Sequence, residues 1–489
     1  MSERKKLMLF SHVCNTRSIT GAEKLLLFLA RKLSLHFDCV IVAPHEGILT
    51  KLAEDYGIRV LFYETPMLYT MCDPNEFLNR DAQQLKNHPA TAGLVDLLVR
   101  EAPAYVFVNT CVNIVPAMAA KSRGIPVIWH ITEIIRDNAH TEGAVAIVDR
   151  YSDWIIGISE TAVAPFQGKP AESKVSLLYP SWGDEFHPDQ WPAKRLAKRK
   201  AWGISADAKV IGYISSFLIA EKGADHFVEA AGLLAKKYPE LYFVVIGGEV
   251  DRTYYASLKK NAADSGRSSR FLFIDYEKDI EGAYSAMDLV VIPSLLSEGF
   301  GMTAMEAMIF GKPVVAYASG GLREILQFTG NERYLVPTGD KEGLTAKISE
   351  LLELPDALQQ VGLENQRRVE SIFGSEAYES RLLSILGHIL SLSGQTVPME
   401  EALYAFDASP EAPAPLPEPV GPTPARPAGI PLKRRGRRLK RKGLPRRRRR
   451  TRFSASRKAR RKPGRSRRTV RRGRSRRRRS RRRAAAGRR

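Results

Sequence analysis

The chain has 489 residues, enough for two or three domains, and a formal net charge of +23. The charge is uneven, because 34 of the 76 Lys and Arg residues lie in 433–489, where no acid occurs, which leaves 42 basic against 53 acidic residues in 1–432. These totals exclude a uniformly basic protein and describe an acidic globular part with a basic tail. The four cysteines form neither a CxxC pair nor a cluster with histidine, so neither a zinc site nor a disulfide framework is expected.

The N-terminus, MSERKKLMLFSH, does not have the apolar stretch of a signal peptide. No run in the chain approaches the ~18 apolar residues of a membrane span. Both observations favour a cytoplasmic protein and leave a peripheral contact with a membrane open.

Eleven short apolar runs follow one another along the chain, and helical patterns separate them. They are continuous rather than alternating, as in parallel strands that are covered on both faces. Strands that alternate with helices predict parallel sheets with right-handed crossovers. A break at residues 181–200 divides the runs into KKLMLFSH, FDCVIVAP, RVLFYE, AYVFVNT, PVIWHI and DWIIGIS before it, and KVIGYISSF, LYFVVIGG, RFLFIDY, DLVVIPS and PVVAYAS after it.

The pattern predicts an α/β fold with two Rossmann-like, doubly wound domains that face a cleft, with six strands in one and five in the other. We expect one Rossmann-like domain over residues 1–185 and a second over residues 186–372. A closing C-terminal helix is expected over residues 373–392. The Pro/Ala-rich residues 396–432 resemble an extended linker, and residues 433–489 have too little apolar content to fold, which predicts a disordered Arg-rich tail.

The stretch SEGFGMTAME, residues 297–306, places Glu298 and Glu306 around a glycine-rich turn that follows the run DLVVIPS. Ligands of open parallel sheets bind outside the carboxyl ends of the strands. A helix is expected to begin near Gly301 or Met302, where its N–H groups and dipole favour a phosphate, and Gly299 and Gly301 allow a close approach. The two carboxylates suit sugar hydroxyls on either side of that phosphate. The stretch therefore favours a nucleotide sugar.

Two other interpretations of this stretch remain open. Acids near a helix start are common because they complement the helix dipole. GFGMTA also fits the dinucleotide pattern G-x-G-x-x-A. Against a dinucleotide site, the turn does not follow its strand directly, and the next run ends in Ser319 and Gly320 without an acid for an adenosine ribose.

SEGFGMTAMEA resembles the E-x7-E segment of the retaining family-4 glycosyltransferases, glycosyltransferases group 1, which have the GT-B fold. The resemblance runs from residue 6 to about residue 388. It implies that residues 1–185 form the acceptor-side domain and residues 186–372 the nucleotide-sugar donor domain. The order and spacing of the segments make it specific. The other segments that resemble the family are TGAEKLLLFLA, PVIWH, DWIIGISE, EKGADHFVEA, GGLREIL and YLVPTGDKEGL.

The resemblance implies a role for each matching residue in the second half of the chain. Glu306 would bind the ribose hydroxyls of the donor, and Glu298 would contact hydroxyls of the transferred sugar. Thr303 shares the helix face of Glu306, at i, i+3 spacing, and belongs to the same donor site. The backbone N–H groups of the turn would bind the sugar and the diphosphate, and these belong to Phe300, Gly301 and Met302.

Four further positions complete the implied site. Lys222 would neutralise the diphosphate charge, and Gly21 would let the first loop approach the diphosphate or the acceptor. His130, expected just past its strand, would face the sugar and stabilise charge in the transition state. Ser216 stands where the family often has an arginine that helps to hold the phosphates, and the hinge YPSWGDEF departs from the usual Y-N-G-(I/V)-D. Taken alone, His130 and Lys222 would be a structural histidine and a solvated lysine.

The implied reaction transfers a sugar from a nucleotide diphosphate sugar to an acceptor hydroxyl with retention of anomeric configuration, as in the hexosyltransferases of EC class 2.4. The donor would be a UDP- or GDP-sugar, and the acceptor a glycan, a lipid or a small molecule of cell-envelope or spore polysaccharide synthesis. The family has no dependable carboxylate nucleophile, so the leaving diphosphate is expected to help to deprotonate the acceptor. No D-x-D motif occurs, and neither a cofactor nor a metal is expected.

The tail, with 29 Arg and 5 Lys residues, predicts a polyanionic partner: nucleic acid, anionic lipid or an acidic polymer. Its composition is similar to arginine-rich extensions of some spore-coat-associated proteins, which adds a spore surface to the expected peripheral locations. An alternative function is therefore a catalytically weak GT-B scaffold that acts as a structural or coat-associated binding protein through this tail. A nucleic-acid-binding protein without sugar chemistry is the third possibility.

Overall fold

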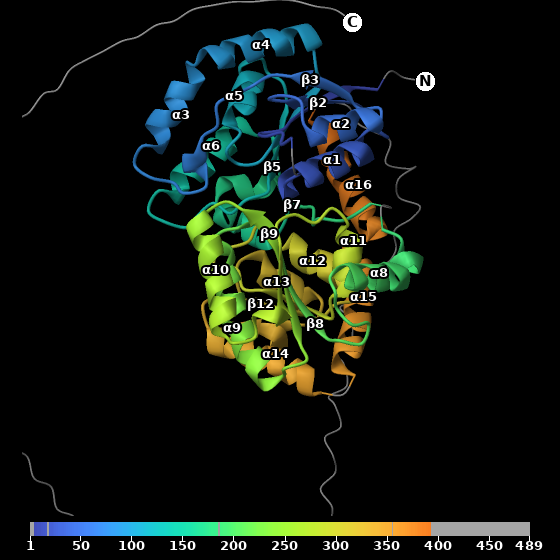
Figure 1. Cartoon of the computed structure of the whole chain (residues 1–489). Helices are drawn as coiled ribbons and strands as arrows, with labels where there is room; N and C mark the ends of the chain where they lie inside the picture. Colours follow the sequence, from blue (N-terminus) through green and yellow to red (C-terminus); the bar gives the residue numbers. More distant parts are fainter. Residues whose placement is uncertain (1–3, 17–18, 184–185, 355, 393–489) are drawn as a thin grey trace, which may run out of the picture. The chain divides into compact units, whose positions relative to one another are not determined.

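A computed structural model describes residues 4–16, 19–183, 186–354 and 356–392, and they contain two parallel sheets with their helices (Figure 1). The linker expected over residues 396–432 and the tail expected over residues 433–489 lie outside the described residues.

The first sheet has seven strands in the order β3-β2-β1-β4-β5-β6-β7, and all pairs are parallel. Its strands are β1 Lys6–Phe10, β2 Asp38–Ala43, β3 Arg59–Phe62, β4 Tyr105–Asn109, β5 Val127–Ile131, β6 Trp154–Gly157 and β7 Val175–Leu177. The helices between these strands are α1 Gly21–Leu33, α2 Ile48–Asp55, α3 Leu78–Lys86, α4 Pro89–Glu101, α5 Ile114–Ser122, α6 Thr141–Tyr151 and α7 Glu160–Val163.

The second sheet has six strands in the order β10-β9-β8-β11-β12-β13, again all parallel. Its strands are β8 Val210–Leu218, β9 Tyr242–Glu249, β10 Phe271–Ile274, β11 Leu289–Ile292, β12 Val314–Tyr317 and β13 Leu335–Val336. Helix α8 Trp191–Ala201 precedes them, and the helices that follow are α9 Ala224–Lys237, α10 Arg252–Asp264, α11 Ile280–Ala286, α12 Met302–Ile309, α13 Gly321–Phe328, α14 Lys341–Glu353, α15 Ala357–Phe373 and α16 Ser375–Ser391.

Strand β1 shows why a continuous apolar run suits this fold. Met8 and Phe10 are buried in one hydrophobic cluster, and Leu7 and Leu9, which alternate with them, are buried in another. Both faces of the sheet are therefore covered, as the sequence predicts.

Helix α16 returns from the second sheet to the first. Its buried face joins the cluster that contains Leu9 and Phe28, and Phe28 makes an edge-to-face contact with Tyr378 at 4.9 Å. Trp154 of β6 stacks on His388 of α16 at 4.4 Å. The chain segment that follows the second sheet thus packs on the first.

The expected architecture of two Rossmann-like parallel sheets is confirmed, but the expected number of strands is wrong. Each of the eleven apolar runs contains a strand, and the structure adds β7 and β13. These two strands are three and two residues long and lie at sheet edges. An edge strand pairs with a neighbour on one side only. These two strands are too short to carry an apolar run that would reveal them in the sequence. The expected domain limits stay predictions.

The described helices include none that is both long and apolar enough to cross a bilayer. The four cysteines are free thiols, of which Cys72 alone is not fully buried.

Candidate active site

The loop between β11 and α12 carries the two glutamates that the sequence singles out. Helix α12 begins at Met302, and Gly301 caps it with a φ of 108°, a left-handed conformation that favours glycine. A Cβ built on Gly301 would also lie 2.7 Å from Leu322 Cδ2. The expected helix start is therefore confirmed, and its first N–H groups, including those of Met302 and Thr303, have no partner within the helix.

A glycine pair closes the next loop onto this one. Gly321 N donates to Glu298 O at 2.8 Å, and Gly320 pairs with Glu298 in a parallel bridge. A Cβ on Gly320 would lie 2.3 Å from Glu298 O, and one on Gly321 would lie 2.5 Å from Phe300 Cα. Only glycines allow this approach, so the GGLREIL segment fixes the backbone of the glutamate loop.

Lys222 and Glu298, from different loops, form an ion pair. Lys222 Nζ donates to both carboxylate oxygens of Glu298, at 2.7 and 2.9 Å. Backbone contacts set the position of Lys222, because the N–H groups of Leu295 and Leu296 donate to Glu221 O at 2.9 and 3.0 Å. The pair follows β8 and β11, at the carboxyl ends of neighbouring strands.

Glu306 lies on α12 and has partners on helices of both domains. The Tyr284 hydroxyl, from α11, donates to Glu306 Oε2 at 2.8 Å, and Lys24 Nζ, from α1, lies 3.3 Å from Oε1. Burial raises the pKa of Tyr284 well above its ordinary value, so its hydroxyl remains a donor. Nothing in the sequence marks Tyr284 as a residue of the site, because it lies 22 residues before Glu306 in the chain.

His130 lies inside β5 and not just past it, which corrects the expectation from the sequence. It is only 3% exposed, and its Nδ1 lies 3.0 Å from Asn109 Oδ1. Because Asn109 Nδ2 donates to Ala22 O at 3.1 Å, the amide oxygen faces the imidazole and Nδ1 carries the proton. Burial lowers the pKa of His130 to about 3, so at neutral pH the ring is uncharged and Nε2 is an acceptor.

The first loop is held by a buried carboxylate that the sequence analysis missed. Glu23, fully buried, accepts hydrogen bonds from Asn15 N, Asn15 Nδ2, Thr20 N and Thr20 Oγ1 at 2.8 to 3.0 Å. The T-x-x-E spacing of Thr20 and Glu23 is a capping box and could have revealed it. A Cβ on Gly21 would meet no atom within 4 Å, so packing does not require glycine there.

Two expected donor-site residues differ from the rest in their surroundings. The Phe300 side chain is buried against Phe373, 5.3 Å away between ring centroids, so only its backbone can face a ligand. Ser216 is exposed and lies in β8 where the register with β9 shifts between Ile214 and Phe217. Among the described side-chain hydrogen bonds, none joins Ser216 to the Lys222–Glu298 pair.

The glutamate loop also contacts the first sheet. Ser159 Oγ, after β6, donates to Gly299 O at 2.5 Å, and a Cβ on Gly299 would lie 2.6 Å from Thr132 O, after β5. Gly299 is thus required by contact with the first domain's backbone, a reason that the sequence did not suggest. The carboxyl ends of strands from both sheets meet at this loop.

A cavity of about 1250 Å³ opens at this contact. Residues 295–299, which include Glu298, line it from the second domain. The first domain contributes residues 132–139, further residues between Thr141 and Lys169, and Cys72 and Asp73. Of the residues expected to act in catalysis, Glu298 lines this cavity. In the described part of the chain, no group of three His, Cys, Asp or Glu side chains could hold a metal ion.

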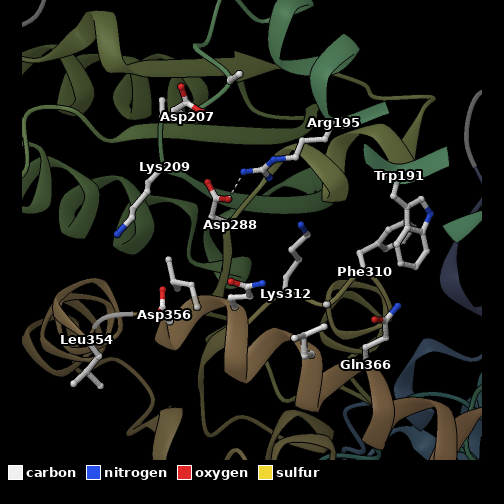
Figure 2. A pocket seen from close by; sticks show the side chains of 16 residues that line it. Trp191, Arg195, Asp207, Lys209, Asp288, Phe310, Lys312, Leu354, Asp356 and Gln366 are labelled. Atoms are coloured by element: carbon white, nitrogen blue, oxygen red, sulfur yellow. Dashed lines mark hydrogen bonds and ion pairs between the residues drawn. The ribbon is translucent and has the colours of Figure 1, made fainter. Parts of the chain in front are cut away.

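A second cavity, of about 730 Å³, lies at the opposite edge of the second sheet (Figure 2). Lys209, Asp288 and Lys312 line it, and they come just before β8, β11 and β12. Figure 2 shows Arg195 beside Asp288, an ion pair of 2.6 Å. This is the amino edge of the sheet, and it contains none of the residues that the sequence assigned to the site.

Comparison with known proteins shows which proteins this chain resembles. Residues 194–368 match the family described as glycosyl transferases group 1. The D-inositol 3-phosphate glycosyltransferase of Thermobispora bispora is 28% identical over 216 residues, which cover 42% of this chain and 50% of that protein. The lipopolysaccharide core biosynthesis mannosyltransferase LpsB of Rhizobium meliloti is 31% identical over 153 residues, 31% of this chain and 43% of that protein. The alignments thus span half or less of these relatives.

Solved structures extend the likeness to both sheets. Anabaena HepE, in complex with UDP-glucose, has a TM-score of 0.64 at 21% identity, over 78% of this chain and 99% of that one. WaaG, a glycosyltransferase involved in lipopolysaccharide biosynthesis, has a TM-score of 0.55 at 14% identity, over 76% and 99%. The described chain therefore has the GT-B fold, and its second domain matches the group 1 glycosyl transferases.

Proposed function

We propose that the protein is a retaining glycosyltransferase that moves a sugar from a nucleotide diphosphate sugar to an acceptor hydroxyl. One observation carries this proposal: Glu298, paired with Lys222, precedes the start of α12, and Glu306, bonded to Tyr284, lies on that helix. The helix start and the lysine suit a diphosphate, and the carboxylates suit the sugars at its two ends.

In the reaction the residues mainly position the donor and stabilise the leaving group. The N-terminus of α12 would bind the diphosphate. Lys222 would leave its ion pair with Glu298 and bind the diphosphate, on which negative charge develops as the bond to the sugar breaks. Glu298 would then accept hydrogen bonds from the transferred sugar, and Glu306 from the ribose. His130, being neutral, would accept a hydrogen bond through Nε2 rather than supply a positive charge.

Retention follows in this proposal from a front-face route. The bond between the anomeric carbon and the diphosphate breaks, the acceptor oxygen bonds to the same face, and the acceptor proton passes to the leaving diphosphate. Positioning and electrostatic stabilisation supply the rate enhancement. Neither a cofactor nor a metal takes part in this route.

The choice of donor and partners is also a proposal. The HepE structures hold UDP, glucose or UDP-glucose, which makes UDP-sugars the first donors to test and GDP-sugars the second. The comparisons do not favour the scaffold alternative, because the named relatives are transferases. A glycan, lipid or small-molecule acceptor and a polyanion that binds residues 433–489 complete the proposal.

The test is a thermal-shift screen of the full chain with UDP-, GDP- and ADP-sugars, together with release of the nucleoside diphosphate. We expect one donor to raise the melting temperature and to be hydrolysed slowly, and Glu306→Ala to lose both effects. Glu332→Ala, at an exposed glutamate of the same domain, is the matched control. If no donor shifts the melting temperature and none is cleaved, the proposal is wrong.

A further inference from the structure

The cavity at Glu298 has an excess of negative charge. Five carboxylate side chains and two basic ones line it. Both bases are already paired: Arg136 Nη1 lies 2.8 Å from Asp73 Oδ2, and Lys169 Nζ lies 2.6 Å from Glu142 Oε1. The cavity lining therefore offers no basic side chain that is not already bonded to a carboxylate.

Two acidic residues of the lining remain outside these pairs. Among the described residues, Glu133 and Asp137 take part in no ion pair, and Glu298 is paired with Lys222 from outside the lining. A concave site with carboxylates in excess repels a phosphate or carboxylate ligand and favours a neutral or cationic one. Its hydrogen-bonding capacity is mainly that of acceptors, which suit the hydroxyls of a polyol.

Glu133 lies next to the contact between the two domains. Thr132, the preceding residue, places its carbonyl oxygen 2.6 Å from a Cβ built on Gly299, and Glu298 precedes that glycine. The two carboxylates thus flank one backbone contact, one from each domain, and both line the same cavity. Cys111 N, after β4, donates to Glu133 Oε2 at 3.2 Å and helps to orient the carboxyl group.

The surroundings of Glu133 support a role in binding rather than in folding alone. Burial raises its pKa to about 7, and the carboxyl group nevertheless has no basic partner among the described residues. A partly desolvated acid in a cavity, beside a residue expected to contact the transferred sugar, is typical of a functional group.

We propose that Glu133 accepts a hydrogen bond from the acceptor substrate, and that this cavity selects a polyhydroxylated acceptor without anionic groups. This inference rests on the proposed glycosyltransferase function and names the acceptor class of the same site. Glu133 binds and orients the acceptor beside the sugar that Glu298 contacts. Asp137 adds to the field that excludes phosphorylated acceptors.

The experiment uses the full chain with saturating UDP and three matched probes: glucose, glucosamine and glucose 6-phosphate. Binding is measured by calorimetry at one ionic strength and at a pH above 7, where the Glu133 carboxyl group is ionised. We expect glucose and glucosamine to bind more tightly than glucose 6-phosphate, and Glu133→Gln to weaken both about 10-fold, the effect of one hydrogen bond to a charged group. Glu76→Gln, at an exposed glutamate of the first domain, should change nothing.

A second variant guards against a folding defect in Glu133→Gln. Asp137→Asn replaces an exposed residue, and we expect it to reduce the discrimination against glucose 6-phosphate while the melting temperature stays constant. Tightest binding of glucose 6-phosphate, no binding of any probe, or unchanged affinities in both variants would overturn the inference.

Failure of the inference can be told from failure of the proposed function. If a donor binds and is hydrolysed but the order of the three probes is reversed, only the acceptor class is wrong. If no donor binds, the proposed function is wrong, and the three probes are then compared without nucleotide.

Discussion

Lys222 and Glu298 bind each other through both carboxylate oxygens, at 2.7 and 2.9 Å, although the family resemblance assigns them to different parts of the donor. Lys222 is the expected diphosphate ligand, and Glu298 the expected ligand of the transferred sugar. In the described structure each therefore satisfies the other's charge. A donor that inserts its diphosphate beside Lys222 has to compete with Glu298, so the two side chains act as a unit.

The first prediction is that substitutions of this pair are not additive. Lys222→Ala and Glu298→Gln should each weaken donor binding. The double variant should lose less binding free energy than the sum of the two single losses, because each single change leaves the other charge without its partner. The side chains are 29% and 18% exposed, so we expect a coupling free energy of about 0.5 to 1 kcal/mol. Calorimetry with the donor on the four proteins measures it. Strict additivity would show that Lys222 and Glu298 contribute to donor binding independently and not as a unit.

The second prediction concerns the hydroxyl that holds Glu306. Tyr284→Phe removes the 2.8 Å hydrogen bond while the ring stays, and it should raise the donor KM by about 10-fold because Glu306 loses its orientation. Steady-state release of the nucleoside diphosphate measures the change. Tyr255→Phe is the matched control, because Tyr255 donates to Asp275 at 2.7 Å outside the site. Equal effects of the two variants would refute a special role for Tyr284.

The third prediction follows from the uncharged His130. Its pKa is about 3 in the folded protein against an ordinary value of 6.5, so between these values the unfolded state binds more protons and the free energy of unfolding falls as the pH falls. His130→Gln should remove this dependence. Between pH 6.5 and pH 5 the wild type should lose about 1.5 kcal/mol more than the variant. Denaturant unfolding across this range measures the difference.

Other groups titrate in the same pH range. Their effect on the free energy of unfolding is the same in wild type and variant, so the comparison cancels it. Burial lowers the pKa of His12 to about 4, which acts in the same direction. The raised pKa of Glu133, about 7, acts in the opposite direction, because the folded state then binds more protons between pH 4.5 and pH 7. Parallel curves for wild type and His130→Gln would show that His130 is not held neutral.

The sequence predicted those parts of the site that lie close together along the chain. Glu298, Gly301 and Glu306 fall within one strand–turn–helix segment, so hydrophobic periodicity and turn chemistry sufficed to place them. The Thr20–Glu23 capping box was equally local and could have been found. These features depend on spacings that a single helix or turn fixes.

The partners that come from distant segments could not be found in this way. Tyr284 and Asn109 carry no motif, and only the packing of separate elements brings them to Glu306 and His130. The place of His130 inside β5 was missed because strand ends cannot be fixed to one residue from an apolar run. The same limit hid the edge strands β7 and β13.

The last prediction concerns Glu324, which the sequence placed in GGLREIL without a role and which the structure makes a contact between the domains. Its carboxylate accepts hydrogen bonds from Glu160 N at 2.8 Å and from Thr161 N at 2.6 Å, and also from the Thr161 hydroxyl. These N–H groups begin α7, and Glu324 is only 7% exposed. Its carboxylate therefore caps a helix of the first domain from the second.

Glu324→Ala should leave these donors without their partner and lower the free energy of unfolding by about 1 to 3 kcal/mol. It should also speed amide exchange at residues 160–163 and raise the donor KM, because the neighbouring Gly299 contact aligns the glutamate loop with the first sheet. Exposed Glu342 of α14 supplies the control Glu342→Ala. Faster exchange with an unchanged donor KM would separate the two roles and restrict Glu324 to stability, because the glutamate loop would then hold its conformation without this cap.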